Sequence, residues 1–286
     1  MRWEGRRESG NIEDRRGMRV PGGRGAGLGC GTLIFVIVVS WLTGVNPLQL
    51  LGLVSSVQQQ MAPAPSAEQV PAGPPPADDA QARFISVVLA DTEDVWNQVL
   101  QGQYREPILV LFDGRVVSAC GFTSAAVGPF YCPGDQKVYL DLSFFRELSQ
   151  RFGAPGDFAQ AYVVAHEVGH HVQNLLGVSD QVSALQQRSR SPEQRNALSV
   201  RLELQADCFA GVYGNKSQQY LDEGDVEEGL RAAAAIGDDR IQRQAQGDVA
   251  PESWTHGSSE MRMRWLRRGL EQGDPEACDT FSAPSL

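Results

Sequence analysis

An uncharged apolar run near the N-terminus constrains this 286-residue chain more than any other feature. Residues 31–45 read GTLIFVIVVSWLTGV, and the stretch from Leu28 to Val45 approaches the roughly 20 residues that cross a bilayer as a helix. Seven arginines precede it, so the positive-inside rule places the N-terminus in the cytoplasm and the later residues outside. A buried core helix and a cleaved signal peptide are the alternatives. A core helix is rarely uncharged on every face, and the end of this run offers no good cleavage site.

A proline-rich spacer follows the apolar run. Residues 58–81 contain six prolines and few large apolar side chains, a composition typical of an extended, semi-rigid linker. We therefore expect an Arg-rich cytoplasmic tail (1–27), a transmembrane anchor with its flank (28–57), the linker (58–81) and one folded domain (82–286). The net charge of −10 argues against a nucleic-acid partner, because phosphates must be met by positive charge.

The domain carries strand signals first and helix signals later. Apolar runs at 108–112 and 137–141 lie next to Asp-Gly and Pro-Gly-Asp turns, which indicates hairpins and a small sheet. Residues 84–101 show helical spacing, and four later helices are expected to begin near Asp157, Ser191, Asp225 and Ser258. This order predicts an α+β fold, with a small N-terminal sheet and a mainly helical half, preceded by one transmembrane helix.

Four cysteines lie beyond the linker, and they allow three pairings. Cys120 and Cys132 close a short loop across an expected hairpin, which leaves Cys208 to pair with Cys278. Buried free thiols are the alternative. An oxidising compartment outside the cell favours the two disulfides.

An HExxH sequence, from His166 to His170, lies within the helix expected from Asp157. Residues four apart project from one face of a helix, so both imidazoles can hold a zinc ion. Glu167 is turned about 100° from His166, where it can reach a zinc-bound water as the general base of a metallopeptidase. A helix with solvated histidines is the alternative. The surrounding valines make the helix largely buried, and buried His and Glu side chains are costly without a metal.

A catalytic zinc ion needs a third protein ligand, and the segment RLELQAD offers one. Glu203 and Asp207 are four residues apart on one helix face. Glu203 can supply the third ligand oxygen, and Asp207 can accept a hydrogen bond from a ligand histidine and fix its tautomer. A solvated acidic face is the alternative, but the neighbouring apolar residues leave little solvated surface. We therefore predict one Zn²⁺ per chain.

The segments HEVGHHVQ, RLELQADCFAG and THGSSEMRMRWL together resemble the bacterial neutral zinc metallopeptidase family, and the resemblance covers about residues 25–272. The family is similar to the gluzincins, in which a glutamate on a second helix completes HExxH. The resemblance implies His166, His170 and Glu203 as ligands, Glu167 as base and Asp207 as the residue that orients a ligand. It also implies a zincin-like catalytic half and a bacterial membrane location.

His256 is the remaining candidate. It precedes Arg262 by six residues, a spacing similar to that of membrane-linked gluzincins, which implies that His256 stabilises the oxyanion of the tetrahedral intermediate. A loop histidine beside a helix cap is the alternative.

The predicted function is a membrane-anchored zinc endopeptidase acting on proteins or peptides outside the cell. A substrate strand is expected to pair with the sheet at 137–141. The alternative is a membrane-anchored scaffold or interaction protein that binds zinc without catalysis.

Overall fold

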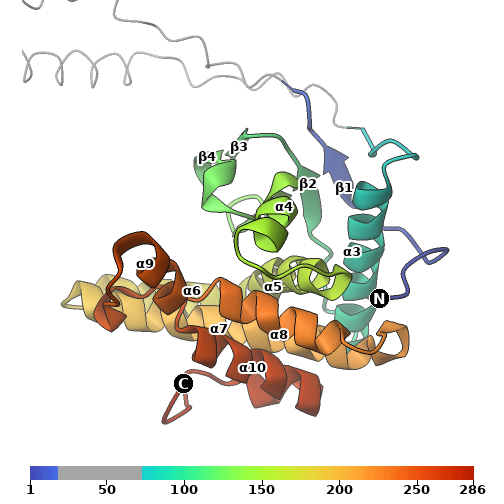
Figure 1. Cartoon of the computed structure of the whole chain (residues 1–286). Helices are drawn as coiled ribbons and strands as arrows, with labels where there is room; N and C mark the ends of the chain where they lie inside the picture. The colour runs from blue at the N-terminus through green and yellow to red at the C-terminus, as the bar shows by residue number, and fades with distance from the viewer. Residues whose placement is uncertain (19–72) are drawn as a thin grey trace, which may run out of the picture. The chain divides into compact units, whose positions relative to one another are not determined.

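Four short strands form the main sheet of the computed structural model, which describes residues 1–18 and 73–286 (Figure 1). In spatial order they are β1 (Ile12–Asp14), β2 (Ile108–Leu111), β6 (Lys137–Leu140) and β5 (Phe130–Cys132). The pairs β1–β2 and β2–β6 are parallel, and β5 runs antiparallel to β6 at the edge. The last three residues of both β2 and β6 are apolar and buried, as expected for central strands. β6 therefore pairs with a strand on each side and has no free edge. The prediction that a substrate strand pairs with residues 137–141 is wrong for this reason.

A separate hairpin lies beside this sheet. It consists of β3 (Arg115–Ser118) and β4 (Gly121–Ser124), followed by the short 3-10 helix η1 (Ala125–Val127). The Cys120–Cys132 disulfide joins the hairpin to β5. The second disulfide, Cys208–Cys278, joins a long helix to the C-terminal segment. Both predicted pairings are confirmed.

Helices make up most of the rest of the described chain (Figure 1). Their bounds are α3 Ala80–Val99, α4 Ser143–Gln150, α5 Asp157–Leu175, α6 Val178–Arg188, α7 Pro192–Lys216, α8 Asp225–Ala235, α9 Asp238–Gln246 and α10 Ser259–Gln272. Further 3-10 turns are η2 Gln218–Tyr220, η3 Pro251–Ser253 and η4 Pro275–Cys278. The order of strands followed by helices holds from residue 108 onwards, but β1 and α3 precede it.

The helix starts show which capping signals were informative. Ser191 accepts a hydrogen bond from Gln194 N at the start of α7, and Ser258 accepts one from Met261 N at the start of α10. The capping box expected at Asp157 is absent, because Gly156 occupies the N-cap of α5. A carboxylate distant in sequence replaces it, since Glu228 on α8 accepts from Phe158 N at 3.2 Å.

Close helix packing brings α5, α7 and α10 together around the buried core. A Cβ atom at Gly269 would lie 2.0 Å from the carbonyl oxygen of Cys208, so only glycine permits this approach of α10 to α7. A Cβ at Gly169 would lie 3.1 Å from the carbonyl oxygen of Ala206, where α5 crosses α7. These contacts hold the HExxH helix against the helix that carries Glu203.

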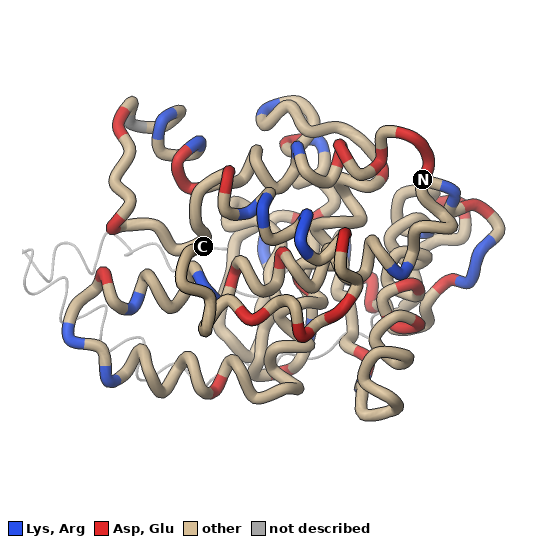
Figure 2. The backbone as a smooth tube through the Cα atoms, turned by 90° about the horizontal axis from the view of Figure 1, so that it is seen from below, with Lys and Arg blue, Asp and Glu red and all other residues tan. Residues whose placement is uncertain are grey.

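Residues 1–18 belong to the same folded unit as residues 73–286. Besides β1, a set of ion pairs holds this segment, and Figure 2 shows the mixture of basic and acidic residues near the N-terminus. Arg6 pairs with the buried Asp91, Arg7 with Glu93, and Arg16 with Asp79. At the other end of the segment, Asp14 N donates to the carbonyl oxygen of Gly73 at 2.9 Å.

These findings correct the predicted fold class and localisation. No helix within residues 1–18 and 73–286 is long and apolar enough to cross a bilayer. The predicted anchor, 28–57, lies outside the described residues. The prediction of a cytoplasmic N-terminus and an extracytoplasmic domain is wrong, because residues 1–18 and residues 73–286 belong to one folded unit. Several arginines that suggested a positive-inside signal instead neutralise carboxylates of the domain.

Candidate metal centre

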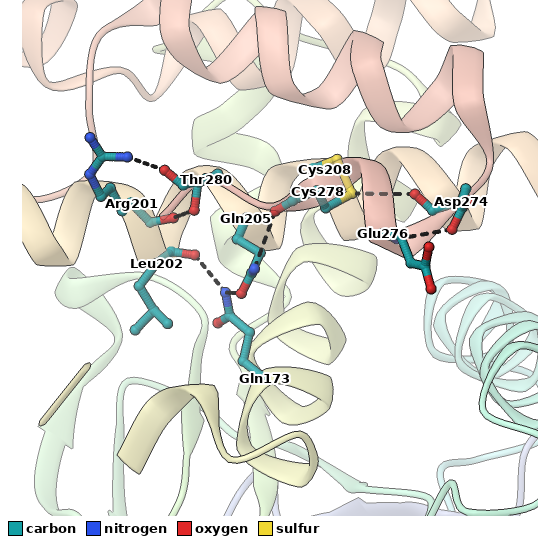
Figure 3. Close-up of a disulfide and its surroundings, with 9 residues drawn as sticks. All are labelled: Gln173, Arg201, Leu202, Gln205, Cys208, Asp274, Glu276, Cys278 and Thr280. Atoms are coloured by element: carbon teal, nitrogen blue, oxygen red, sulfur yellow. Dashed lines mark hydrogen bonds between the residues drawn. A yellow bond between two sulfur atoms is a disulfide. The ribbon is translucent and has the colours of Figure 1, made fainter. Parts of the chain in front are cut away.

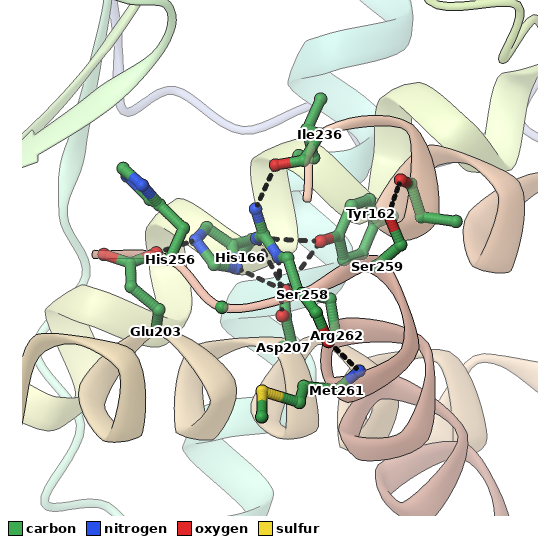
Figure 4. Close-up of polar contacts among 12 residues, drawn as sticks. Tyr162, His166, Glu203, Asp207, Ile236, His256, Ser258, Ser259, Met261 and Arg262 are labelled. Atoms are coloured by element: carbon green, nitrogen blue, oxygen red, sulfur yellow. Dashed lines mark hydrogen bonds and ion pairs between the residues drawn. The ribbon is translucent and has the colours of Figure 1, made fainter. Parts of the chain in front are cut away.

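Helices α5 and α7 bring His166, His170 and Glu203 to one point. The Nε2 atom of His166 lies 3.2 Å from Glu203 Oε2, and the Nε2 atom of His170 lies 3.4 Å from Glu203 Oε1. One ligand atom from each residue lies within 4.8 Å of the other two. Figure 4 shows Glu203 reaching from α7 toward His166. The structure thus assembles the three residues that the sequence predicted as ligands.

The Nδ1 atoms of both histidines have acceptors of their own. Asp207 Oδ1 accepts from His166 Nδ1 at 2.9 Å, and Gln173 Oε1 accepts from His170 Nδ1 at 2.9 Å. When each ring is neutral, these acceptors place its proton on Nδ1 and leave the lone pair of Nε2 facing Glu203, where a metal ion can bind it. Two imidazole nitrogens and one carboxylate are the donor set of a catalytic zinc site, so these residues fit Zn²⁺.

Buried negative charge also favours a cation at this point. Burial alone would lower the pKa of His166, but Asp207 and then Glu203 outweigh it and raise that pKa to about 10. Burial alone would likewise lower the pKa of His170, but Glu203 raises it. Burial would raise the pKa of Glu203, but His170 and His166 hold it well below its usual value. The carboxylate is therefore ionised and available as a ligand.

Asp207 is the hub of a buried polar network (Figure 4). Its carboxylate accepts from His166, from the Tyr162 hydroxyl at 2.6 Å, and from Nε and Nη2 of Arg262, both at 2.9 Å. Burial would raise the pKa of Asp207, but Arg262 and then His166 outweigh it and lower that pKa to about 2. Asp207 therefore stays ionised and holds the ring of His166.

Sequence reasoning missed Tyr162 and Gln173 as parts of this site. Both are buried on α5, Tyr162 four residues before His166 and Gln173 three residues after His170. Helical spacing places such residues on the same face as the histidines, so the signal was present. The sequence showed no partner for either side chain.

Glu167, His171 and His256 occupy different surroundings. Glu167 is buried on α5 next to His166. His171 faces away from the three candidate ligands. Its Nε2 donates to the carbonyl oxygen of Arg105, and its Nδ1 accepts from the Tyr131 hydroxyl at 3.1 Å. The side chain of His256 is 52% exposed, on the loop before α10.

Asp238 organises the loop that carries His256. Its Oδ2 accepts from the backbone N–H groups of Thr255, His256 and Gly257, at 2.7, 2.7 and 3.1 Å. Its Oδ1 lies 3.4 Å from His256 Nδ1 and raises the pKa of that imidazole. His256 also contributes to the lowered pKa of Glu203, as expected for a ring beside that candidate ligand (Figure 4).

A family model described as "Putative neutral zinc metallopeptidase" matches residues 1–281. The chain belongs to this family. It is 47% identical to the uncharacterized protein YpfJ of Escherichia coli strain K12, over 98% of this chain and 99% of that protein. An uncharacterized protein of Mycobacterium tuberculosis is 44% identical over 71% of this chain and 73% of its own length. No solved structure matches the chain significantly. The family membership predicted from the motifs is confirmed.

Proposed function

We propose that this protein is a zinc-dependent endopeptidase that hydrolyses peptide bonds in proteins or peptides. The observation that carries the proposal is that the Nε2 atoms of His166 and His170 converge on the Glu203 carboxylate. Glu167 follows His166 on the same helix, α5. His166, His170 and Glu203 would hold the ion. A zinc ion bound there supplies Lewis-acid chemistry, which polarises the peptide carbonyl and acidifies water.

The side chains of this chain would manage the protons and the charge. Glu167 takes the proton of the attacking water as general base and then delivers it to the leaving amine as general acid. His256, held by Asp238, donates a hydrogen bond to the oxyanion that develops on the former carbonyl oxygen. Asp207 keeps His166 in the tautomer that binds metal.

The sheet offers a place for an extended substrate at β5. This strand lies at the edge of the sheet, antiparallel to β6, and Tyr131 in its centre bonds to His171 on the HExxH helix. A polypeptide that pairs with an edge strand is recognised mainly through its backbone, so such a site tolerates many sequences. We infer that an extended substrate pairs with β5, and not with residues 137–141 as the sequence predicted.

Glu167→Gln tests the proposed function. The full chain is loaded with zinc, and cleavage of an unfolded protein is compared between wild type and variant at equal zinc content. We expect zinc binding to be retained and cleavage to be lost, because glutamine cannot accept the proton. Glu271→Gln, an exposed position on α10, is the matched control and should cleave like wild type.

Each possible outcome distinguishes the proposal from its rival. Zinc binding without cleavage by the wild type would favour a zinc-binding scaffold. Near-normal cleavage by Glu167→Gln would remove Glu167 as the base. Absence of zinc binding by the wild type would overturn the proposal as a whole.

A further inference from the structure

A chain of buried hydrogen bonds runs from the ligand His170 to the C-terminal segment. His170 Nδ1 donates to Gln173 Oε1 at 2.9 Å, and Gln173 Nε2 donates to Gln205 Oε1 at 3.1 Å. Gln205 Nε2 donates to the carbonyl oxygen of Cys278 at 3.2 Å. Figure 3 shows the part of this chain from Gln173 to Cys278. The Gln173 and Gln205 side chains are both buried, so water does not readily replace these bonds.

Two backbone carbonyl groups, those of Cys278 and Leu202, set the direction of the bonds in this chain. A carbonyl oxygen only accepts, so Gln205 must turn its NH₂ group toward Cys278 and its oxygen toward Gln173. Gln173 must then donate to Gln205 and to the carbonyl oxygen of Leu202, which lies 2.7 Å away. The Oε1 atom of Gln173 therefore faces His170, and it can accept a hydrogen bond only if His170 carries a proton on Nδ1. The two backbone carbonyls together favour the tautomer of His170 whose Nε2 can bind metal.

The Cys208–Cys278 disulfide holds the Cys278 carbonyl in place. Cys208 lies on α7 three residues after Gln205, and both sulfur-bearing residues are buried. Cys278 ends η4, after which the chain runs along α7, where Thr280 Oγ1 donates to the carbonyl oxygen of Arg201. The disulfide is the covalent attachment of this segment to α7.

We propose that the Cys208–Cys278 disulfide raises the metal affinity of the centre, by holding the Cys278 carbonyl that, together with the Leu202 carbonyl, orients His170 through Gln205 and Gln173. The inference rests on the metal binding required by the proposed function. Gln173 and Gln205 are positioning residues, since neither reaches the metal point itself. Affinity for the metal, measured without any substrate, is the property they control.

The test measures the zinc dissociation constant of the full chain by competition with a chromophoric chelator. Gln173→Met keeps the length of the side chain and removes its hydrogen bonds, and we expect zinc binding to weaken about 10–100-fold. Gln205→Met and the double variant Cys208→Ala/Cys278→Ala should weaken it in the same direction by a smaller factor. Cys120→Ala/Cys132→Ala removes the other disulfide and is the matched control, with wild-type affinity expected.

A double-mutant cycle separates this relay from general loosening of the fold. With Gln173→Met already present, loss of the Cys208–Cys278 disulfide should weaken zinc binding little further, because the relay is already broken. Equal weakening in both backgrounds would overturn the proposal, as would wild-type affinity in Gln173→Met. If the cysteine variant fails to fold, Gln205→Met carries the test with the disulfide intact. A wild type that binds no zinc would defeat the proposed function as well, so the two failures are distinguishable.

Discussion

Asp207 and Arg262 form a two-point ion pair in the interior of the protein. Arg262 Nε lies 2.9 Å from Asp207 Oδ2, and Nη2 lies 2.9 Å from Oδ1, with both side chains almost fully buried. The pair joins α10 to α7, and the same carboxylate bonds to His166 on α5. Three helices therefore meet at one charged group, and the orientation of a proposed metal ligand depends on it.

Arg262→Met should destabilise the fold by about 3–5 kcal/mol, because it leaves the buried Asp207 carboxylate without its cation. The free energy of unfolding, measured in urea, checks this. Arg264→Met is the matched control, since Arg264 is exposed on the same helix, and it should change stability by less than about 1 kcal/mol. A loss from Arg262→Met no larger than that of the control would contradict the role given to the pair.

Glu203→Ala should weaken zinc binding strongly while leaving a folded chain, because it removes one of three converging donors. The zinc content after dialysis and the zinc dissociation constant measure the effect. Glu193→Ala, at an exposed position on α7, is the matched control. If Glu203→Ala binds zinc as tightly as wild type, the third ligand is another residue.

His256→Phe should lower kcat by about 10²–10³ and leave KM and zinc content nearly unchanged, as expected for a lost oxyanion donor. Asp238→Asn should act in the same direction with a smaller effect, because the loop loses an ionised acceptor. Steady-state kinetics on an unfolded protein substrate supplies both constants. Loss of zinc from His256→Phe would make His256 a ligand, and unchanged kinetics would make it a loop residue only.

Asp91 should give the fold a pH dependence between about pH 4 and 6. Burial raises the pKa of Asp91 to about 6, although Arg6 opposes the shift. The folded state therefore keeps the proton that the unfolded state releases, so stability falls as the pH rises through this window. At about 1.4 kcal/mol per pKa unit, wild type should lose up to about 3 kcal/mol relative to Asp91→Asn.

Urea unfolding of both proteins from pH 4 to pH 7 measures this difference. Comparison with the variant cancels the contribution of the other carboxylates. Asp94→Asn is the matched control, because Asp94 is exposed on the same helix. A stability difference between wild type and Asp91→Asn that stays constant across this range would show that Asp91 does not titrate there.

Local patterns predicted much of the site. The HExxH spacing places His166 and His170 on one face of a helix wherever that helix lies. Glu203 and Asp207, also four residues apart, lie on one face of α7 for the same reason. The disulfide pairs followed from loop length and elimination, and the structure contains both. The N-cap predictions were confirmed at Ser191 and Ser258, where the capping side chain is local in sequence. The prediction at Asp157 was wrong, because Glu228 on α8 accepts the hydrogen bond from Phe158 N instead.

By itself the sequence determined which residues can bind a metal and which helices carry them, because helical periodicity is a property of neighbouring residues. Only the tertiary structure decided which faces meet. It placed Gln173 between His170 and Gln205, and Arg262 against Asp207. It also paired Arg6 and Arg7 with buried carboxylates of α3, where charge counting had indicated a membrane signal. A charge pattern records how many cations a segment has, whereas the packed fold determines which anions they neutralise.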